Sequence, residues 1–366
     1  MKNKIDISFN SLMKKVNGET FAALELLLPK NRSNFLRSIS SFNSTNSDFI
    51  QIDERSYKAL SIPLWEILQR NGKGWRSYIL QVSCEAAGHQ FTEFKNWLAL
   101  PEIIHVGSLI IDDIQDSSKI RRGGMACHLI YGIGPAINSG TFAYFIGQKL
   151  IEKTALDNRK KLAIYQEYMT LLREAHIGQG LDIVGLDLVL ADIGTNPDAL
   201  VDAVMDIHWR KSGVVFGSFS RMGAILGSGS ALQIRMLGEF FGEIGTLFQV
   251  HDDIINVTGF QQNLKQQFED LEHRKITLPI AIALQNLSAN TRKQLIQQLA
   301  NKNCDPKLLN QNLIEAINIS NSIQLCEALI EKRYYNALDK LHHSQCKISN
   351  IEHITMFARK ILDIDY

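Results

Sequence analysis

The chain of 366 residues contains little proline and no long apolar run. Its seven prolines lie far apart, which leaves long stretches in which a helix can form without interruption. Polar residues break each apolar run well before the roughly 20 residues that a membrane-spanning helix needs. The sequence also begins without the apolar core of a secretory signal. We therefore expect a cytoplasmic protein with no membrane span.

Cysteine and net charge are also scarce. The five cysteines are scattered and never spaced as Cys-x-x-Cys, which argues against a disulfide framework and against a zinc site. Lys and Arg number 39 and Asp and Glu number 38, so the formal net charge is +1. A nearly neutral chain gives no global electrostatic reason to bind nucleic acid or an anionic membrane. Chemistry that depends on charge must come from local clusters.

Apolar residues repeat at helical spacing along much of the chain. Steps of three and four residues run through 161–182 and 232–255, and few stretches alternate with period two. This pattern predicts an all-α fold. Residues 30–56 are rich in Ser and Asn and predict a loop, and a second break is expected at 185–199. We therefore divide the chain into 1–56, an N-terminal helix with its connection, and one large helical domain over 57–366.

The most informative segment is an apolar helix that ends in Asp112, Asp113 and Asp116. Residues i and i+4 share a helix face, so Asp112 and Asp116 point the same way. Two carboxylates this close repel each other unless cations lie beside them. Such oxygen ligands suit Mg²⁺ that keeps waters and also binds substrate phosphates. Arg121 and Arg122 follow, and arginine suits contact with phosphate oxygens.

A second cluster repeats this pattern at the end of another long apolar helix, as Asp252, Asp253 and Asn256. One such motif alone could be a solvated helix end, but two copies point to function. Several basic residues are each weak signals alone, because solvated lysines and satisfied core histidines are common. They are the turn from Gly72 through Lys73 to Arg76, His105 two turns before Asp112, Lys211 in Lys-Ser-Gly, and the pair Lys265 and Lys275.

Together these segments resemble the trans-isoprenyl diphosphate synthases, most closely the geranylgeranyl diphosphate synthase type. The order of signals matches from about residue 57 to 290. Beyond the residues above, the matching motifs include Gly178-Gln179 with Asp182, Phe248-Gln249, and Lys275 to Pro279. The resemblance implies a large single-domain helical bundle around a central cavity, usually a homodimer, and it makes 57–366 the isoprenyl diphosphate synthase domain.

The resemblance implies a prenyltransferase of isoprenoid biosynthesis. Such an enzyme condenses isopentenyl diphosphate with an allylic diphosphate (dimethylallyl, geranyl or farnesyl) through ionisation, condensation and elimination, with three Mg²⁺ ions when diphosphate is bound. The implied metal ligands are Asp112, Asp116 and Asp252, and the implied catalytic residues are these three with Lys211, Ser212 and Gln249. The implied substrate-binding residues are Lys73, Arg76, His105, Arg121, Arg122, Lys211, Gln249, Lys265 and Lys275.

Product length is expected to depend on residues below Asp112 on its helix. In the family, aromatic residues four and five positions before this aspartate stop the product at fifteen carbons. Here these positions are Ser108 and Gly107, with Ile104 one turn deeper, so we expect a twenty-carbon product, geranylgeranyl diphosphate. Aromatic residues that could form a floor deeper in the tunnel are Phe142, Tyr144 and Phe145.

Several positions depart from the family pattern and leave two alternatives open. One is a class I terpene cyclase, which shares the fold and the metal chemistry but needs no isopentenyl diphosphate site. The other is a non-catalytic partner subunit, against which the retained aspartates argue. The departures are Gly74 and Ser77 in the basic turn, Thr141 after Gly140, Asn256 in the second cluster, and Phe268 and Arg274 in the closing segment.

Overall fold

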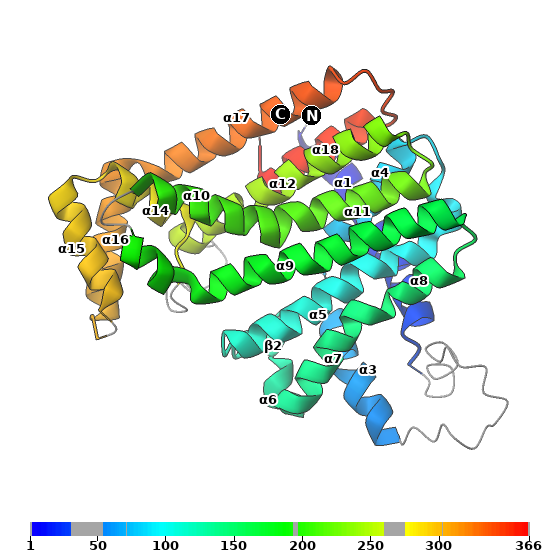
Figure 1. Cartoon of the computed structure of the whole chain (residues 1–366), viewed down its shortest axis with the longest axis horizontal. Helices are drawn as coiled ribbons and strands as arrows, with labels where there is room; N and C mark the ends of the chain where they lie inside the picture. Colours follow the sequence, from blue (N-terminus) through cyan, green and yellow to red (C-terminus); the bar gives the residue numbers. More distant parts are fainter. Residues whose placement is uncertain are drawn as a thin grey trace. The chain divides into compact units, whose positions relative to one another are not determined.

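The predicted all-α fold is confirmed by a computed structural model (Figure 1). It describes residues 2–30, 54–70, 72–192, 197–259, 275–301 and 303–364. Within these ranges helices dominate, and the sheet is one short hairpin of β1 (Ile120–Arg121) and β2 (Gly124–Met125). The two strands pair antiparallel, with Arg121 opposite Gly124.

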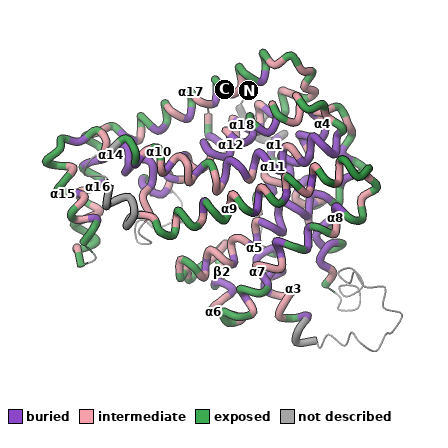
Figure 2. Tube along the Cα trace, viewed as in Figure 1, coloured by how far each residue is buried: buried purple, intermediate pink, exposed green. Residues whose placement is uncertain are grey.

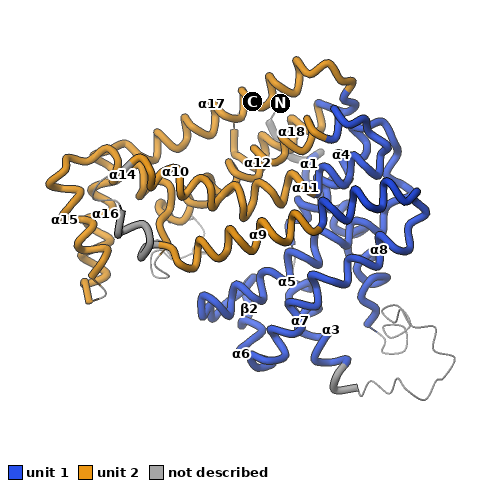
Figure 3. Tube along the Cα trace, in the orientation of Figure 1, with its two compact units in different colours: residues 1–168, 219–234, 348–351 blue, residues 169–218, 235–347, 352–366 orange. Residues whose placement is uncertain are grey.

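The chain forms two compact units (Figure 3). Unit 1 consists of residues 1–168, 219–234 and 348–351, and unit 2 consists of residues 169–218, 235–347 and 352–366. The expected division at residue 56 stays a prediction. Among the described helices, four contribute residues to both units: α9 (Asn158–Asp192), α11 (Val214–Leu226), α12 (Ala231–Thr258) and, by its first residue, α18 (Ile351–Leu362).

Unit 1 is built around α5 (Ala99–Gln115), which packs against its neighbour α7 (Ile133–Ile146). Glycines allow the two helices to approach closely: a Cβ added at Gly107 would lie 2.6 Å from the carbonyl oxygen of Gly140. The remaining elements of this unit are α1 (Lys2–Leu27), α3 (Glu54–Leu68), α4 (Trp75–Ala86), the 3₁₀ helix η2 (Phe91–Leu98), α6 (Cys127–Tyr131) and α8 (Gln148–Lys153).

Unit 2 contains a π-helical turn, η3 (Trp209–Gly213), that packs on the largely buried helix α12 (Figure 2). Small residues make this contact possible, because a Cβ added at Gly213 would lie 2.5 Å from Thr246 Oγ1. The other helices are α10 (Pro197–His208), α14 (Leu278–Asn286), α15 (Ala289–Ala300), α16 (Pro306–Ser320), α17 (Ser322–His342) and α18 (Ile351–Leu362).

The predicted helical stretches 161–182 and 232–255 lie inside α9 and α12. The expected break at 185–199 begins with a kink in α9, where Gly185 has φ 41° and ψ −125°. Residues 31–53, most of the Ser- and Asn-rich connection, lie outside the described residues. Across the described helices, none is long and apolar enough to cross a membrane. All five cysteines are free thiols.

Candidate functional site

The first aspartate cluster lies at the C-terminal end of α5. Asp116 caps this end, and its N–H donates to the carbonyl oxygen of Asp112 at 2.8 Å. Asp112 and Asp116 are both half-buried, whereas Asp113 is fully buried. The cluster therefore has two aspartates at a partly accessible helix face and one directed into the protein.

Asp113 pairs with Arg121 of the hairpin. Its Oδ1 accepts a hydrogen bond from Arg121 Nε at 2.7 Å, and Arg121 Nη2 lies 2.5 Å from the same oxygen and 3.9 Å from Asp112 Oδ2. Burial raises the pKa of Asp113. The negative charge of Asp112 raises this pKa further, whereas Arg121 acts to lower it. Arg121 is thus held beside both aspartates, and its predicted contact with diphosphate stays a prediction.

Arg70, which the sequence analysis missed, holds the hairpin in place. Its Nη1 donates to the carbonyl oxygens of Arg121 at 2.8 Å and Met125 at 3.0 Å, and its Nη2 donates to Glu66 at 2.8 Å. Gly124 leaves room for the guanidinium, because a Cβ there would lie 2.6 Å from Arg70 Cζ. No sequence signal distinguishes this arginine from a surface residue.

A basic cluster forms around Glu102, one turn before His105 on α5. Arg122 Nη2 donates to Glu102 Oε1 at 3.1 Å, and Gly72 lies against the same carboxylate. Burial lowers the pKa of Arg76 to about 10; Glu102 opposes this shift and Arg122 adds to it. Burial, with repulsion from Arg76 and Arg122, also lowers the pKa of His105 well below its usual value, so this imidazole is neutral at pH 7.

The basic turn lies at the start of α4. Gly74 is the residue before the helix and adopts a left-handed conformation, with φ 64°. A Cβ at this position would meet the Asn17 side chain of α1, which gives a physical reason for glycine here. Lys73 is exposed, and its ammonium lies 4.4 Å from the ring centroid of Trp75. The structure therefore places Arg76, His105 and Arg122 in one cluster and leaves Lys73 at its solvent side.

In unit 2, two predicted lysines share one carboxylate. Asp182 Oδ2 lies 2.6 Å from Lys211 Nζ and 3.2 Å from Lys275 Nζ. Burial alone would raise the pKa of Asp182, but the two lysines outweigh it and hold this pKa below its usual value. The π-helical turn and the stretch before α14 thus bring Lys211 and Lys275 together, although they lie 64 positions apart in the sequence. Lys265, Phe268 and Arg274 lie outside the described residues.

The second aspartate cluster ends α12 beside the same turn. Ser212 Oγ donates to Gln249 Oε1 at 3.0 Å, which joins two predicted catalytic residues. Asp252 is half-buried, while Asp253 and Asn256 are almost fully buried. A carboxylate in place of the buried Asn256 would need cationic partners, so an amide costs less there. At this departure from the family pattern the side chain is buried, and the half-buried Asp252 is retained.

The predicted product-length residues occupy different surroundings on α5. Ile104 is buried, and Ser108 is half-buried with its hydroxyl donating to the carbonyl oxygen of His105 at 2.8 Å. A side chain at Gly107 would meet α7 rather than open space. Among the floor candidates, Tyr144 is buried and Phe142 half-buried, whereas Phe145 is 64% exposed.

The carboxylates fit Mg²⁺ by their chemistry and position. Asp112 and Asp116 offer oxygen ligands one turn apart at a helix C-terminus, where the helix dipole also favours a cation. Within the described ranges, no group of three or more His, Cys, Asp or Glu side chains could hold a metal ion by itself. An ion here would take its other ligands from water and substrate phosphate, as Mg²⁺ commonly does.

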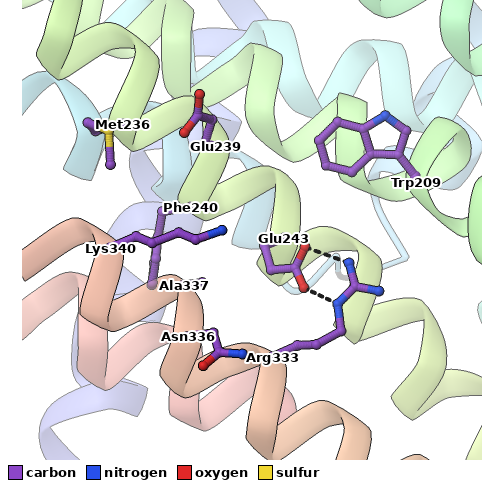
Figure 4. Close-up of a pocket in the computed structure, with 9 residues that line it drawn as sticks. All are labelled: Trp209, Met236, Glu239, Phe240, Glu243, Arg333, Asn336, Ala337 and Lys340. Atoms are coloured by element: carbon purple, nitrogen blue, oxygen red, sulfur yellow. Dashed lines mark hydrogen bonds and ion pairs between the residues drawn. The ribbon is translucent and has the colours of Figure 1, made fainter. Parts of the chain in front are cut away.

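A cavity of about 360 Å³ lies between α12 and α17, apart from the predicted site residues (Figure 4). Trp209 of the π-helical turn forms one wall, and an ion pair between Arg333 and Glu243, with Nη2 to Oε2 at 2.8 Å, forms another. None of the residues that we predicted for catalysis, metal or substrate lines it. The cavity therefore does not contribute to the candidate active site.

The helical fold and the aspartates at the ends of two helices agree with the prenyltransferase class that the motifs indicated. The chain belongs to the polyprenyl synthetase family, whose model matches residues 57–317. This confirms the family, the fold class and the type of enzyme that the sequence motifs indicated.

Relatives and solved structures agree with this assignment. The chain is 29% identical over 251 residues to a geranylgeranyl pyrophosphate synthase of Macrophomina phaseolina, covering 65% of this chain and 72% of that protein. A geranylgeranyl pyrophosphate synthetase structure from Pyrococcus horikoshii matches with TM-score 0.78 and 18% identity, over 98% of this chain and all of that one. A structure of a geranylgeranyl pyrophosphate synthase from Corynebacterium glutamicum, complexed with isoprenyl diphosphate and magnesium, also matches. Its TM-score is 0.75 and its identity 19%, and the match covers 96% of this chain and 98% of that chain.

Proposed function

We propose that this prenyltransferase joins isopentenyl diphosphate to an allylic diphosphate (dimethylallyl, geranyl or farnesyl) and makes mainly geranylgeranyl diphosphate. The observation that carries the proposal is a group of cationic side chains in unit 1, formed by Arg76 and Arg122. It is separate from the cationic residues proposed for the diphosphate at the aspartates. It lies about two turns along α5 from Asp112, near His105 and apart from the aspartates. A synthase with two diphosphate substrates needs such a site, whereas a class I terpene cyclase does not.

We infer that the aspartates hold the allylic diphosphate through Mg²⁺. When bound at Asp112, Asp116 and Asp252, Mg²⁺ supplies positive charge that stabilises the departing diphosphate, with three ions expected. Lys211 and Lys275 would add positive charge for the same diphosphate, a role that the sequence motifs also predict for Lys265. Because developing charge on the leaving group is the main obstacle, these fixed charges lower the barrier to ionisation.

The remaining residues handle the second substrate and the allylic cation. Arg76, Arg122 and Lys73 bind the diphosphate of isopentenyl diphosphate, and neutral His105 donates a hydrogen bond to it. Ser212 and Gln249, which are joined by a hydrogen bond, would orient dipoles toward the cation. None of the residues proposed for this site is a strong general base, so the released diphosphate accepts the proton that the condensation frees.

Product analysis tests the proposed reaction. With an allylic diphosphate, isopentenyl diphosphate and Mg²⁺, we expect chiefly a twenty-carbon prenyl diphosphate. A cyclic hydrocarbon formed without isopentenyl diphosphate would identify a terpene cyclase instead. No product under either condition would support a non-catalytic partner subunit.

The metal ligands are tested by single substitutions. Asp112→Ala or Asp252→Ala should lower kcat by at least about 100-fold while circular dichroism stays unchanged, because each removes an oxygen ligand that holds charge at the leaving group. Asp339→Ala is the matched control, since this aspartate is 70% exposed on α17 and lies outside the site. Near-normal turnover of either site variant at saturating Mg²⁺ would contradict the assignment.

We also propose that the protein is a homodimer in the cytosol. Exposed apolar side chains on two successive helices support the dimer: Leu129 of α6, and Ile133, Ile137 and Phe145 of α7. The free cysteines support a reducing compartment. Ile137→Asp should shift the protein from dimer to monomer in sedimentation velocity; a wild-type monomer, or a variant that stays dimeric, would contradict this interface.

A further inference from the structure

Asp253, the second aspartate of the cluster that ends α12, is buried and hydrogen-bonded inside unit 2. Its Oδ2 accepts a hydrogen bond from His208 Nε2 at 2.8 Å and another from the backbone N–H of Leu278 at 2.7 Å. Asp253 is 3% exposed and His208 is 6% exposed. A buried carboxylate persists only with such partners, so these contacts define where Asp253 can lie.

The two hydrogen bonds join three segments that carry proposed site residues. His208 ends α10 and directly precedes the π-helical turn with Lys211 and Ser212. Asp253 follows Asp252 on α12. The third segment reaches from Lys275 to the start of α14 at Leu278. One carboxylate oxygen thus fixes the relative positions of all three.

The contact with Leu278 also caps α14. The first N–H groups of a helix have no partner inside it, and Thr277, the residue before α14, gives no side-chain cap. Pro279 has no N–H to satisfy. The charge of Asp253 at this N-terminus is favoured by the helix dipole as well. The position of α14, and of the stretch that leads to it, therefore depends on a residue of α12.

We propose that His208 and Asp253 form a positioning pair: His208 fixes the Asp253 carboxylate, and Asp253 holds the π-helical turn, the end of α12 and the stretch before α14 in register. Both side chains are buried, and neither is among the residues proposed to touch substrate or metal. The pair affects catalysis by positioning Lys211, Asp252 and Lys275. Because the roles of these three residues belong to the proposed function, the proposal rests on that function.

Two substitutions of His208 separate positioning from packing. His208→Leu removes the N–H with little change in volume, whereas His208→Gln keeps an N–H at a similar reach. We expect His208→Leu to lower kcat roughly 10- to 150-fold, the range for loss of one charge-assisted hydrogen bond, with each KM changed less than about threefold. His208→Gln should stay within about threefold of wild type in kcat. Arg333→Gln is the matched control, because it breaks a contact to Glu243 on the same helix α12 outside the site, and it should leave kcat unchanged.

A second readout needs neither metal nor turnover. Hydrogen–deuterium exchange of the Leu278 amide, followed by mass spectrometry in metal-free protein, reports whether Asp253 still caps α14. We expect exchange to be at least about tenfold faster in His208→Leu and unchanged in His208→Gln and Arg333→Gln. Should His208→Leu not fold, Asp253→Leu, which removes both carboxylate oxygens with little change in size, replaces it with the same expected loss of kcat and of protection.

The outcomes are decisive in either direction. Unchanged kcat or unchanged Leu278 exchange in the disrupting variant overturns the proposal, and so does a His208→Gln variant as defective as His208→Leu. A double variant, His208→Leu with Asp253→Leu, should be no worse than the poorer single variant; additive losses would show that the two residues act separately. A wild-type protein that makes no prenyl diphosphate would refute the proposed function, while the exchange experiment would still decide the pair.

Discussion

Gly107→Ala should destabilise unit 1, because this glycine lies where α5 and α7 approach closely. The new methyl group would lie 2.6 Å from the carbonyl oxygen of Gly140 and 2.6 Å from Ala143 Cβ. The first of these atoms belongs to the backbone and cannot rotate away, so α7 would have to move. Overpacking of this kind costs typically about 1–3 kcal/mol.

The cost of the clash can be isolated with a second glycine. Gly18 lies within α1, also in unit 1, and a Cβ added there would meet nothing within 4 Å. Gly18→Ala should therefore stabilise the protein by about 0.5–1 kcal/mol through helix propensity alone. Because both variants gain this propensity term, their difference reports the clash, and we expect it to be about 1–3 kcal/mol.

The assay is urea unfolding followed by circular dichroism, with the free energy of unfolding extrapolated to water for both variants. If the free energy of unfolding of Gly107→Ala equalled that of Gly18→Ala, the conclusion that α5 and α7 approach closely at Gly107 would be wrong. The prediction also bears on product length. A larger residue at position 107 should change the product by displacing α7, which carries Tyr144, rather than by filling the tunnel directly.

Two further predictions concern the substrates. Ser108→Phe should shorten the main product from twenty to fifteen carbons, because a ring one turn below Asp112 occupies space about 6 Å along the tail. Chromatography of the products checks this prediction. An unchanged product distribution would mean that the tail does not pass Ser108. Arg76→Ala should raise the KM for isopentenyl diphosphate roughly 10- to 150-fold, through loss of a charge-assisted contact, and the KM for the allylic substrate far less. Equal increases in steady-state kinetics would show that the cluster around Glu102 is not a dedicated site.

Local physics made much of this protein predictable from its sequence. Helical periodicity identified the stretches that became α9 and α12, since the apolar face of a helix repeats in the chain itself. The four-residue spacing placed Asp112 and Asp116 on one face of α5 for the same reason. The order of the motifs sufficed for the family, because they follow one another along the chain in the family's order.

Other features depend on which helix each face meets, and this only the tertiary structure decided. Asp113 and Asp253 look like their neighbours in the sequence, yet they are buried against Arg121 and His208. Nothing local marks Arg70 as the residue that holds the hairpin. Helix geometry fixes the direction of a side chain relative to its own helix, but its partners come from segments far away in the chain. Packing therefore determines which aspartates remain accessible to ligands and which support the fold beneath them.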